Sequence, residues 1–151
     1  MRIVDGLKRF VTGVRKIDPV FGPMLFMGKR AGYWECRVEL DARFPIVEAF
    51  VDGSRDDSME GQRAFFEQFL RTWPDTSNRI AKFLVEKWEN GSTIERPSSA
   101  WDAVMPSSIS IPNASIDHAR WQMTFATLRE PRKFFTVDME GLQPQQLSVD
   151  D

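Results

Sequence analysis

The sequence predicts an α+β fold: an antiparallel β-sheet, made of a meander plus a C-terminal hairpin, packed on one face by a helical hairpin, with an N-terminal amphipathic helix. Two observations indicate the sheet, namely strict alternation of apolar and polar residues over 33–40 and again over 120–128. A third is the helical spacing of apolar residues between positions 58 and 90. The length of 151 residues suits one domain, 1–151.

The first strands lie in residues 21–40, which we interpret as a β-hairpin with a glycine-flanked reversal at 28–32. Its second strand places one set of side chains on a single face: Trp34, Cys36, Val38 and Leu40. Residues 46–51 are β-branched and aromatic, which predicts a third strand of the meander.

Three helices are predicted. Residues 1–16 are amphipathic and carry a basic face. Residues 58–73 form the next helix, with Ser58 or Asp57 as the N-cap, and Pro74 ends it. Residues 75–90 form the last one, and so short a connection predicts that these two helices lie antiparallel on the sheet.

Residues 92–107 contain two prolines and several serines without a sustained period, so we predict a long loop there. A short strand at 109–111 follows. Alternation then predicts strands over 120–128 and 134–139, and a last short strand over 146–149.

The net charge of −2 is unevenly distributed. Five basic residues against one acid give +4 over residues 2–16, whereas seven acids against two arginines give −5 over residues 39–60. The acidic stretch argues against nucleic acid as a partner and predicts a docking face for a protein. The candidate contact residues are Asp52, Asp56, Asp57, Glu60 and, in the long loop, Trp101, for which packing on the core is the alternative.

No catalytic constellation is visible. Cys36 shares the apolar face of its strand, which keeps a thiol unreactive. Asp117 and His118 are neighbours that point to opposite faces of a strand, and no nucleophile motif accompanies them. One cysteine and one histidine cannot form the usual zinc site, the acids of 52–60 do not match a calcium loop, and no glycine-rich phosphate loop is present. We therefore predict no cofactor, no metal and no enzyme activity.

Several short motifs resemble small bacterial domains of the immunity-protein type, which protect against polymorphic or secreted toxins. They are the sequence DPVFG at residues 18–22, Trp34, the Lys87-Trp88 pair, WQMTF at 121–125 and FFTVDMEGLQP at 134–144. In such families the toxin-contacting residues vary, so the resemblance implies a function but transfers no site.

The sequence and the resemblance together favour a non-enzymatic protein-binding domain that neutralises a cognate toxin by occupying it. Two alternatives remain open: a small hydrolase or ligand-binding domain with a pocket under loop 92–107, and an assembly subunit that forms a homodimer through its N-terminal helix. No stretch approaches about 18 apolar residues, so no membrane span is predicted, and the single cysteine fits a cytoplasmic protein.

Overall fold

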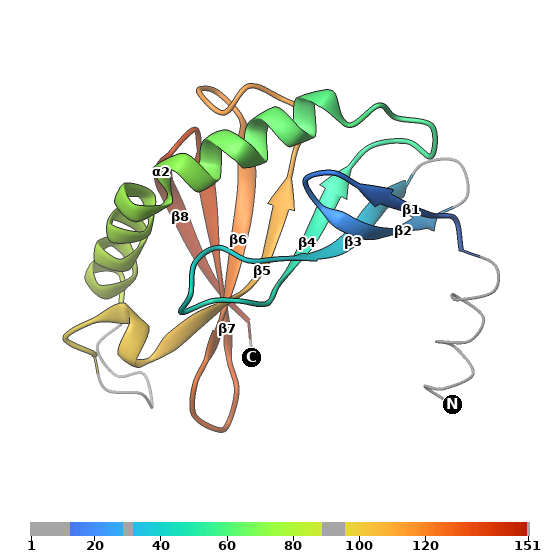
Figure 1. The fold of residues 1–151 in the computed structure, drawn as a ribbon. Helices are drawn as coiled ribbons and strands as arrows, with labels where there is room; N and C mark the ends of the chain where they lie inside the picture. The colour runs from blue at the N-terminus through green and yellow to red at the C-terminus, as the bar shows by residue number, and fades with distance from the viewer. Residues whose placement is uncertain (1–12, 29–31, 89–95, 151) are drawn as a thin grey trace.

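The computed structural model describes residues 13–28, 32–88 and 96–150. It shows one mixed β-sheet of eight strands in chain order, with one long helix over one face (Figure 1). The strands are β1 (Arg15–Asp18), β2 (Gly22–Gly28), β3 (Gly32–Val38), β4 (Val47–Asp52), β5 (Val104–Ile111), β6 (Arg120–Thr127), β7 (Phe134–Glu140) and β8 (Gln143–Asp150). The helices are α2 (Glu60–Glu86) and the short 3₁₀ helix η1 (Ala100–Asp102).

The predicted fold class is wrong in two respects. The sheet is not purely antiparallel, because β4 and β5 pair in parallel while every other neighbouring pair is antiparallel. A parallel pair needs a long crossover connection, and α2 supplies it. The hairpin over 21–40 is present as the antiparallel pair β2–β3, and β4 extends it into the predicted meander.

The second error is the helical hairpin, since α2 continues through Pro74 as one helix of 27 residues. Proline removes one backbone hydrogen bond and bends a helix, and Figure 1 shows α2 changing direction along its length. The buried stripe nevertheless continues on both sides of it, with Phe69 and Trp73 before and Ile80 and Leu84 after. Burial of that stripe against the sheet therefore outweighs the local cost of the proline.

Two further helix predictions, the N-cap at Ser58 or Asp57 and the N-terminal helix over 1–16, have different outcomes. Met59 occupies the N-cap of α2 with a left-handed φ of 66°, and neither Ser58 nor Asp57 caps the helix. The predicted helix over 1–16 lies mostly outside the described residues, and its described end at Arg15 and Lys16 belongs to strand β1.

The predicted loop 92–107 is shorter than expected, because η1 and the first half of β5 fall within it. Pro106 lies in β5 at a register shift opposite β6, where a strand tolerates a residue without a backbone N–H group.

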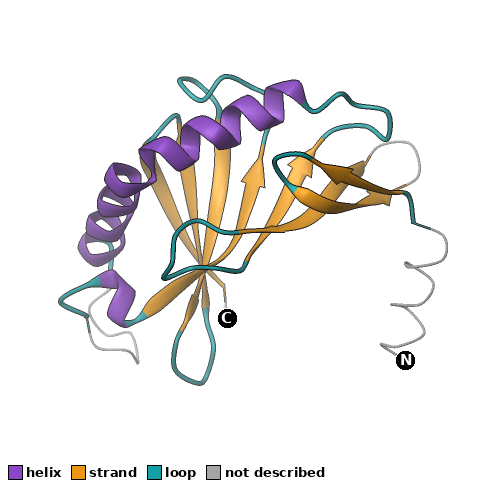
Figure 2. Ribbon diagram, viewed as in Figure 1, coloured by secondary structure: helices purple, strands orange, loops and turns teal. Residues whose placement is uncertain are grey.

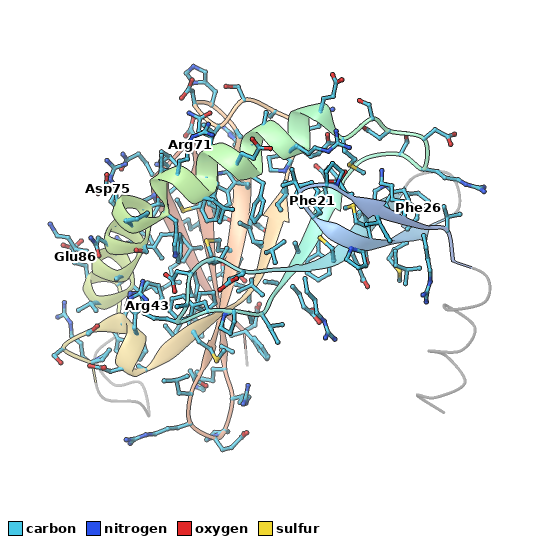
Figure 3. The ribbon with its side chains drawn as sticks, in the orientation of Figure 1. Phe21, Phe26, Arg43, Arg71, Asp75 and Glu86 are labelled. Atoms are coloured by element: carbon cyan, nitrogen blue, oxygen red, sulfur yellow. The ribbon has the colours of Figure 1, made fainter. Side chains whose placement is uncertain are left out.

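The core lies between α2 and the sheet. Phe65 and Phe69 both meet the ring of Trp121 edge-on, with centroid distances of 5.4 and 5.2 Å. Figure 3 labels Phe21, whose ring lies 5.4 Å from that of Phe66 and joins the β1–β2 turn to the helix. On the other side of α2, Arg71, Asp75 and Glu86 project away from the sheet.

A buried ion pair fixes the start of α2 to the first turn of the sheet. Asp18 has a side chain that is 1% exposed, and its Oδ1 atom accepts from Arg63 at 2.7 Å. Its Oδ2 atom accepts from the backbone N–H groups of Val20 and Phe21 at 2.9 and 3.1 Å. Burial raises the pKa of Asp18, but the hydrogen bonds from Arg63, Phe21 and Val20 outweigh it and hold the pKa below its ordinary value.

We predict that Asp18→Asn lowers the free energy of unfolding at pH 7 by about 3 kcal/mol, because Arg63 loses its buried counter-charge. Since the folded-state pKa of Asp18 is lowered, its contribution is complete above the ordinary pKa of 3.8 and is lost as the pH falls through the folded-state value. Urea unfolding between pH 7 and pH 3 should therefore show a weaker acid dependence in the variant.

The matched control is Lys82→Gln, which breaks the exposed pair between Lys82 and Glu86. An exposed pair of this kind contributes less than about 0.5 kcal/mol. Equal losses in the two variants would show that the Asp18–Arg63 contact has no special weight.

Gly141 and Gly22 both have left-handed φ angles, but they differ in the space that is free for an added Cβ atom. Gly141, at φ 57°, turns the chain between β7 and β8, and a Cβ atom there would lie 2.7 Å from the backbone oxygen of Asp117. Gly22, at φ 70°, has no atom within 4 Å of the equivalent position.

We predict that Gly141→Ala lowers the free energy of unfolding by about 2–4 kcal/mol, whereas Gly22→Ala, which adds only the φ penalty, lowers it by about 1 kcal/mol. Thermal and urea unfolding of both variants measure the difference. A smaller loss at Gly141 would contradict the close approach of the 116–118 turn to the β7–β8 turn.

Candidate functional site

The face of the sheet opposite α2 is the candidate site, and we call it the open face. Among the described residues no α-helix covers it (Figure 2). Because side chains alternate along a strand, the residues between the buried positions face outward here. One transverse row crosses all eight strands: Arg15, Leu25, Glu35, Phe50, Ser110, Gln122, Asp138 and Gln146.

One half of the open face contains a polar hollow, which we call the acidic concavity. It has a volume of about 580 Å³ and is lined by residues of β4 to β8: Asp52, Ser110, Arg120, Trp121, Gln122, Asp138, Met139, Glu140, Gln145 and Gln146. Its ionisable side chains are three carboxylates and one guanidinium, so its formal charge is −2. This arrangement favours a cationic group.

The carboxylates of the acidic concavity are held on paired strands. Gln122 donates from Nε2 to Oδ1 of Asp138 at 2.7 Å, across the β6–β7 pair. Arg120 stands opposite Glu140 in the same pair. A rigid sheet therefore positions these groups, which lowers the ordering cost of binding.

Asp52 stands at the end of β4, opposite Tyr33 of β3. Partial burial raises its pKa above the ordinary value of 3.8. Its carboxylate is therefore less well stabilised than one in open water, and a basic group brought beside it would recover the lost interaction.

The other half of the open face, over β1–β4, is more apolar, and we call its hollow the apolar concavity. It has a volume of about 710 Å³ and includes Ile17, Pro23, Leu25 and Phe50 in its lining. The ring of Tyr33 meets that of Phe50 edge-on at a centroid distance of 5.8 Å. The charged side chains of the lining carry both signs, in contrast to the acidic concavity.

The structure brings only one of the predicted contact residues into a concavity, namely Asp52. Asp56, Asp57 and Glu60 lie in the loop before α2 and at its first residue. The Oδ1 atom of Asp57 accepts from the backbone N–H group of Met59 at 2.8 Å, so this carboxylate shapes the entry to the helix.

Trp101 lies apart from these acids. It is partly buried in η1, with its ring 5.3 Å from Phe44 and 5.9 Å from Phe125. Figure 1 shows η1 near the far end of α2 from the acidic loop. Packing on the core is the role that these contacts support.

The residues considered for catalysis do not gather in a hollow. Asp117 and His118 are exposed in the turn before β6 and line neither concavity. Burial, and next the nearby Asp18 carboxylate, raise the pKa of the Cys36 thiol to about 12. Residues 96–107, the described part of the predicted loop, also line neither of the two concavities.

Other features of the described part of the chain limit what the site holds. No group of three or more His, Cys, Asp or Glu residues there is placed to bind a metal ion. No helix within that part has the length and apolar character needed to cross a membrane. Comparisons with protein-family models, with curated proteins and with solved structures found no match to this chain.

Sequence reasoning missed Arg120, Gln122, Asp138 and Glu140. Their signal was present, because each occupies an outward position of a strand whose alternation was recognised. The alternation did not predict which strands are neighbours in the sheet. Asp52 lies beside these residues only because β4 and β5 pair in parallel.

We predict that the Asp52 carboxyl titrates above 3.8 and that of Asp41 below it. Burial raises the pKa of Asp41, but hydrogen bonds from Arg43 and Trp73 lower it by more. Side-chain carboxyl NMR shifts followed from pH 7 to pH 2 measure both. A titration of Asp52 at or below that of Asp41 would contradict the desolvation of Asp52.

Proposed function

We propose that this protein is a non-enzymatic binding domain of the immunity type, which neutralises a basic partner protein by occupying it. The observation that carries the proposal is the acidic concavity on a sheet face that no described α-helix covers. The resemblance of the 18–22, 121–125 and 134–144 motifs to immunity proteins supports the same function.

Electrostatic attraction is the physical basis of the proposed encounter. A face of formal charge −2 attracts and orients a basic surface, and complementary charge mainly raises the association rate and the specificity. Toxins that act on nucleic acid present basic surfaces to their substrate, and an acidic inhibitor can cover such a surface without any chemistry of its own. Nucleic acid itself would be repelled by the acidic concavity.

Under this proposal the protein acts in the cytoplasm. The side chain of Cys36 is buried and unpaired, which suits a reducing compartment. The binding residues are Asp52, Asp138 and Glu140, and the exposed Asp56 and Glu60, in the loop after β4 and at the start of α2, are available to a larger partner.

The test is binding and protection against the product of the gene that adjoins this one. We predict that the wild-type chain forms a complex with that product and protects cells from it. Glu140→Lys should weaken the complex by about tenfold or more, since it replaces an attractive charge with a repulsive one.

Glu86→Lys is the matched control, because it makes the same charge change on an exposed residue of α2. It should leave the affinity within about twofold. No complex and no protection would overturn the proposed function, whereas equal effects of the two variants would show that the partner binds elsewhere.

A further inference from the structure

The apolar concavity exposes hydrophobic side chains that neither α2 nor any other described element covers. Ile17, in the lining of the apolar concavity, is 83% exposed, and Tyr33, outside the lining but against Phe50 on the same face, is 38% exposed. Leu25 and Phe50, partly exposed, stand in one row between them with Glu35. An apolar surface rimmed by charges is typical of a protein interface.

The charges around this surface indicate which partner fits it. On the open face, Arg15 and Arg37 stand with Glu35 and Glu48, so their sum is zero. Lys16 also lines the apolar concavity, but its Nζ atom lies 4.3 Å from the ring of the buried Trp34, on the opposite face of the sheet. A strongly basic or strongly acidic partner gains little from a neutral surface. A second copy of the chain presents the same arginines and glutamates, and a twofold axis pairs every contact reciprocally.

We infer that the open face of β1–β4 is the interface of a homodimer, in which the apolar concavities of two copies pack face to face. Sheets packed in this way lie about 10 Å apart with their inner side chains interdigitated. The row containing Leu25, Glu35 and Phe50 then becomes an inner layer, as the buried side chains of Trp34 and Ala49 on the opposite face of these strands already are in the core.

The acidic concavity limits how far the two copies overlap. Two surfaces of formal charge −2 repel each other, so full superposition of the open faces is unfavourable. The overlap is therefore confined to the lining of the apolar concavity, so that Asp52 at the end of β4 and the strands β6–β8 stay accessible. Each copy of the dimer can then hold its own basic partner, so that self-association and partner binding use different halves of one face.

Sedimentation velocity of the full chain over a range of concentrations tests the inference. We expect a monomer–dimer equilibrium, and Ile17→Glu should raise its dissociation constant at least about tenfold by placing a charge in the apolar layer. Because Ile17 is highly exposed, we expect this variant to fold, and circular dichroism checks that it does. Leu128→Glu, at a 45% exposed position in the β6–β7 turn, is the control and should leave the equilibrium unchanged.

A complementary pair of charge reversals gives an independent readout. Arg37→Glu changes the sum of the four open-face charges to −2, and Glu48→Arg changes it to +2, so each variant alone should dimerise at least about tenfold more weakly. An equimolar mixture of the two variants should form a heterodimer, because their open faces then carry opposite charges. Any effect of each substitution within its own chain is still present in the mixture, so it cannot explain a recovery of dimerisation.

A wild-type chain that remains monomeric at about 1 mM, the weak limit of specific association, would overturn the inference. So would a dimer that Ile17→Glu leaves intact, or a mixture of the charge reversals that stays monomeric. None of these outcomes bears on the proposed function, because the purified chain is tested without its partner.

Discussion

The parallel pairing of β4 with β5 is the constraint on which the rest of the structure depends. An antiparallel pair closes with a short turn, but a parallel pair requires the chain to return to the starting end of the sheet. In this protein α2 makes that return. It spans one face, where the apolar side chains of the strands meet it, and the opposite face is left to carry polar groups and the two concavities.

The same crossover explains how the acidic residues divide their roles. Asp18 and Asp41 lie where the meander meets α2, and each accepts from a side chain of the helix, Arg63 and Trp73. Their negative charge is used to fix the helix to the sheet. Asp52, Asp138 and Glu140 point the other way, and their charge is offered to the open face. The acidic residues of the sequence thus include groups that hold the helix to the sheet and groups that lie on the open face.

The open face is well suited to recognition because its groups need little ordering. Its side chains stand on one continuous sheet in which β2 to β7 are each paired on both sides, and transverse rows repeat across the sheet at a fixed spacing. Neighbouring regions of this single surface differ in character: one is apolar with balanced charge, the other polar with excess negative charge. A single sheet face therefore presents two surfaces of different chemistry without a second domain.

The sequence by itself determined the strands that alternate strongly, 33–38, 120–127 and 134–139, and the apolar stripe of α2, because these patterns depend only on the local period of the backbone. It misplaced the helix boundary at Pro74, and it missed most of β5, where Pro106 and three serines hide a buried strand. In both places packing against distant residues overrode local preference. The tertiary structure alone decided that β4 pairs with β5, and hence that Asp52 lies in the same concavity as Asp138 and Glu140. The physical reason is that a long helix separates the two strands in sequence, so their pairing is set by the burial of their shared apolar face and not by any nearby residue.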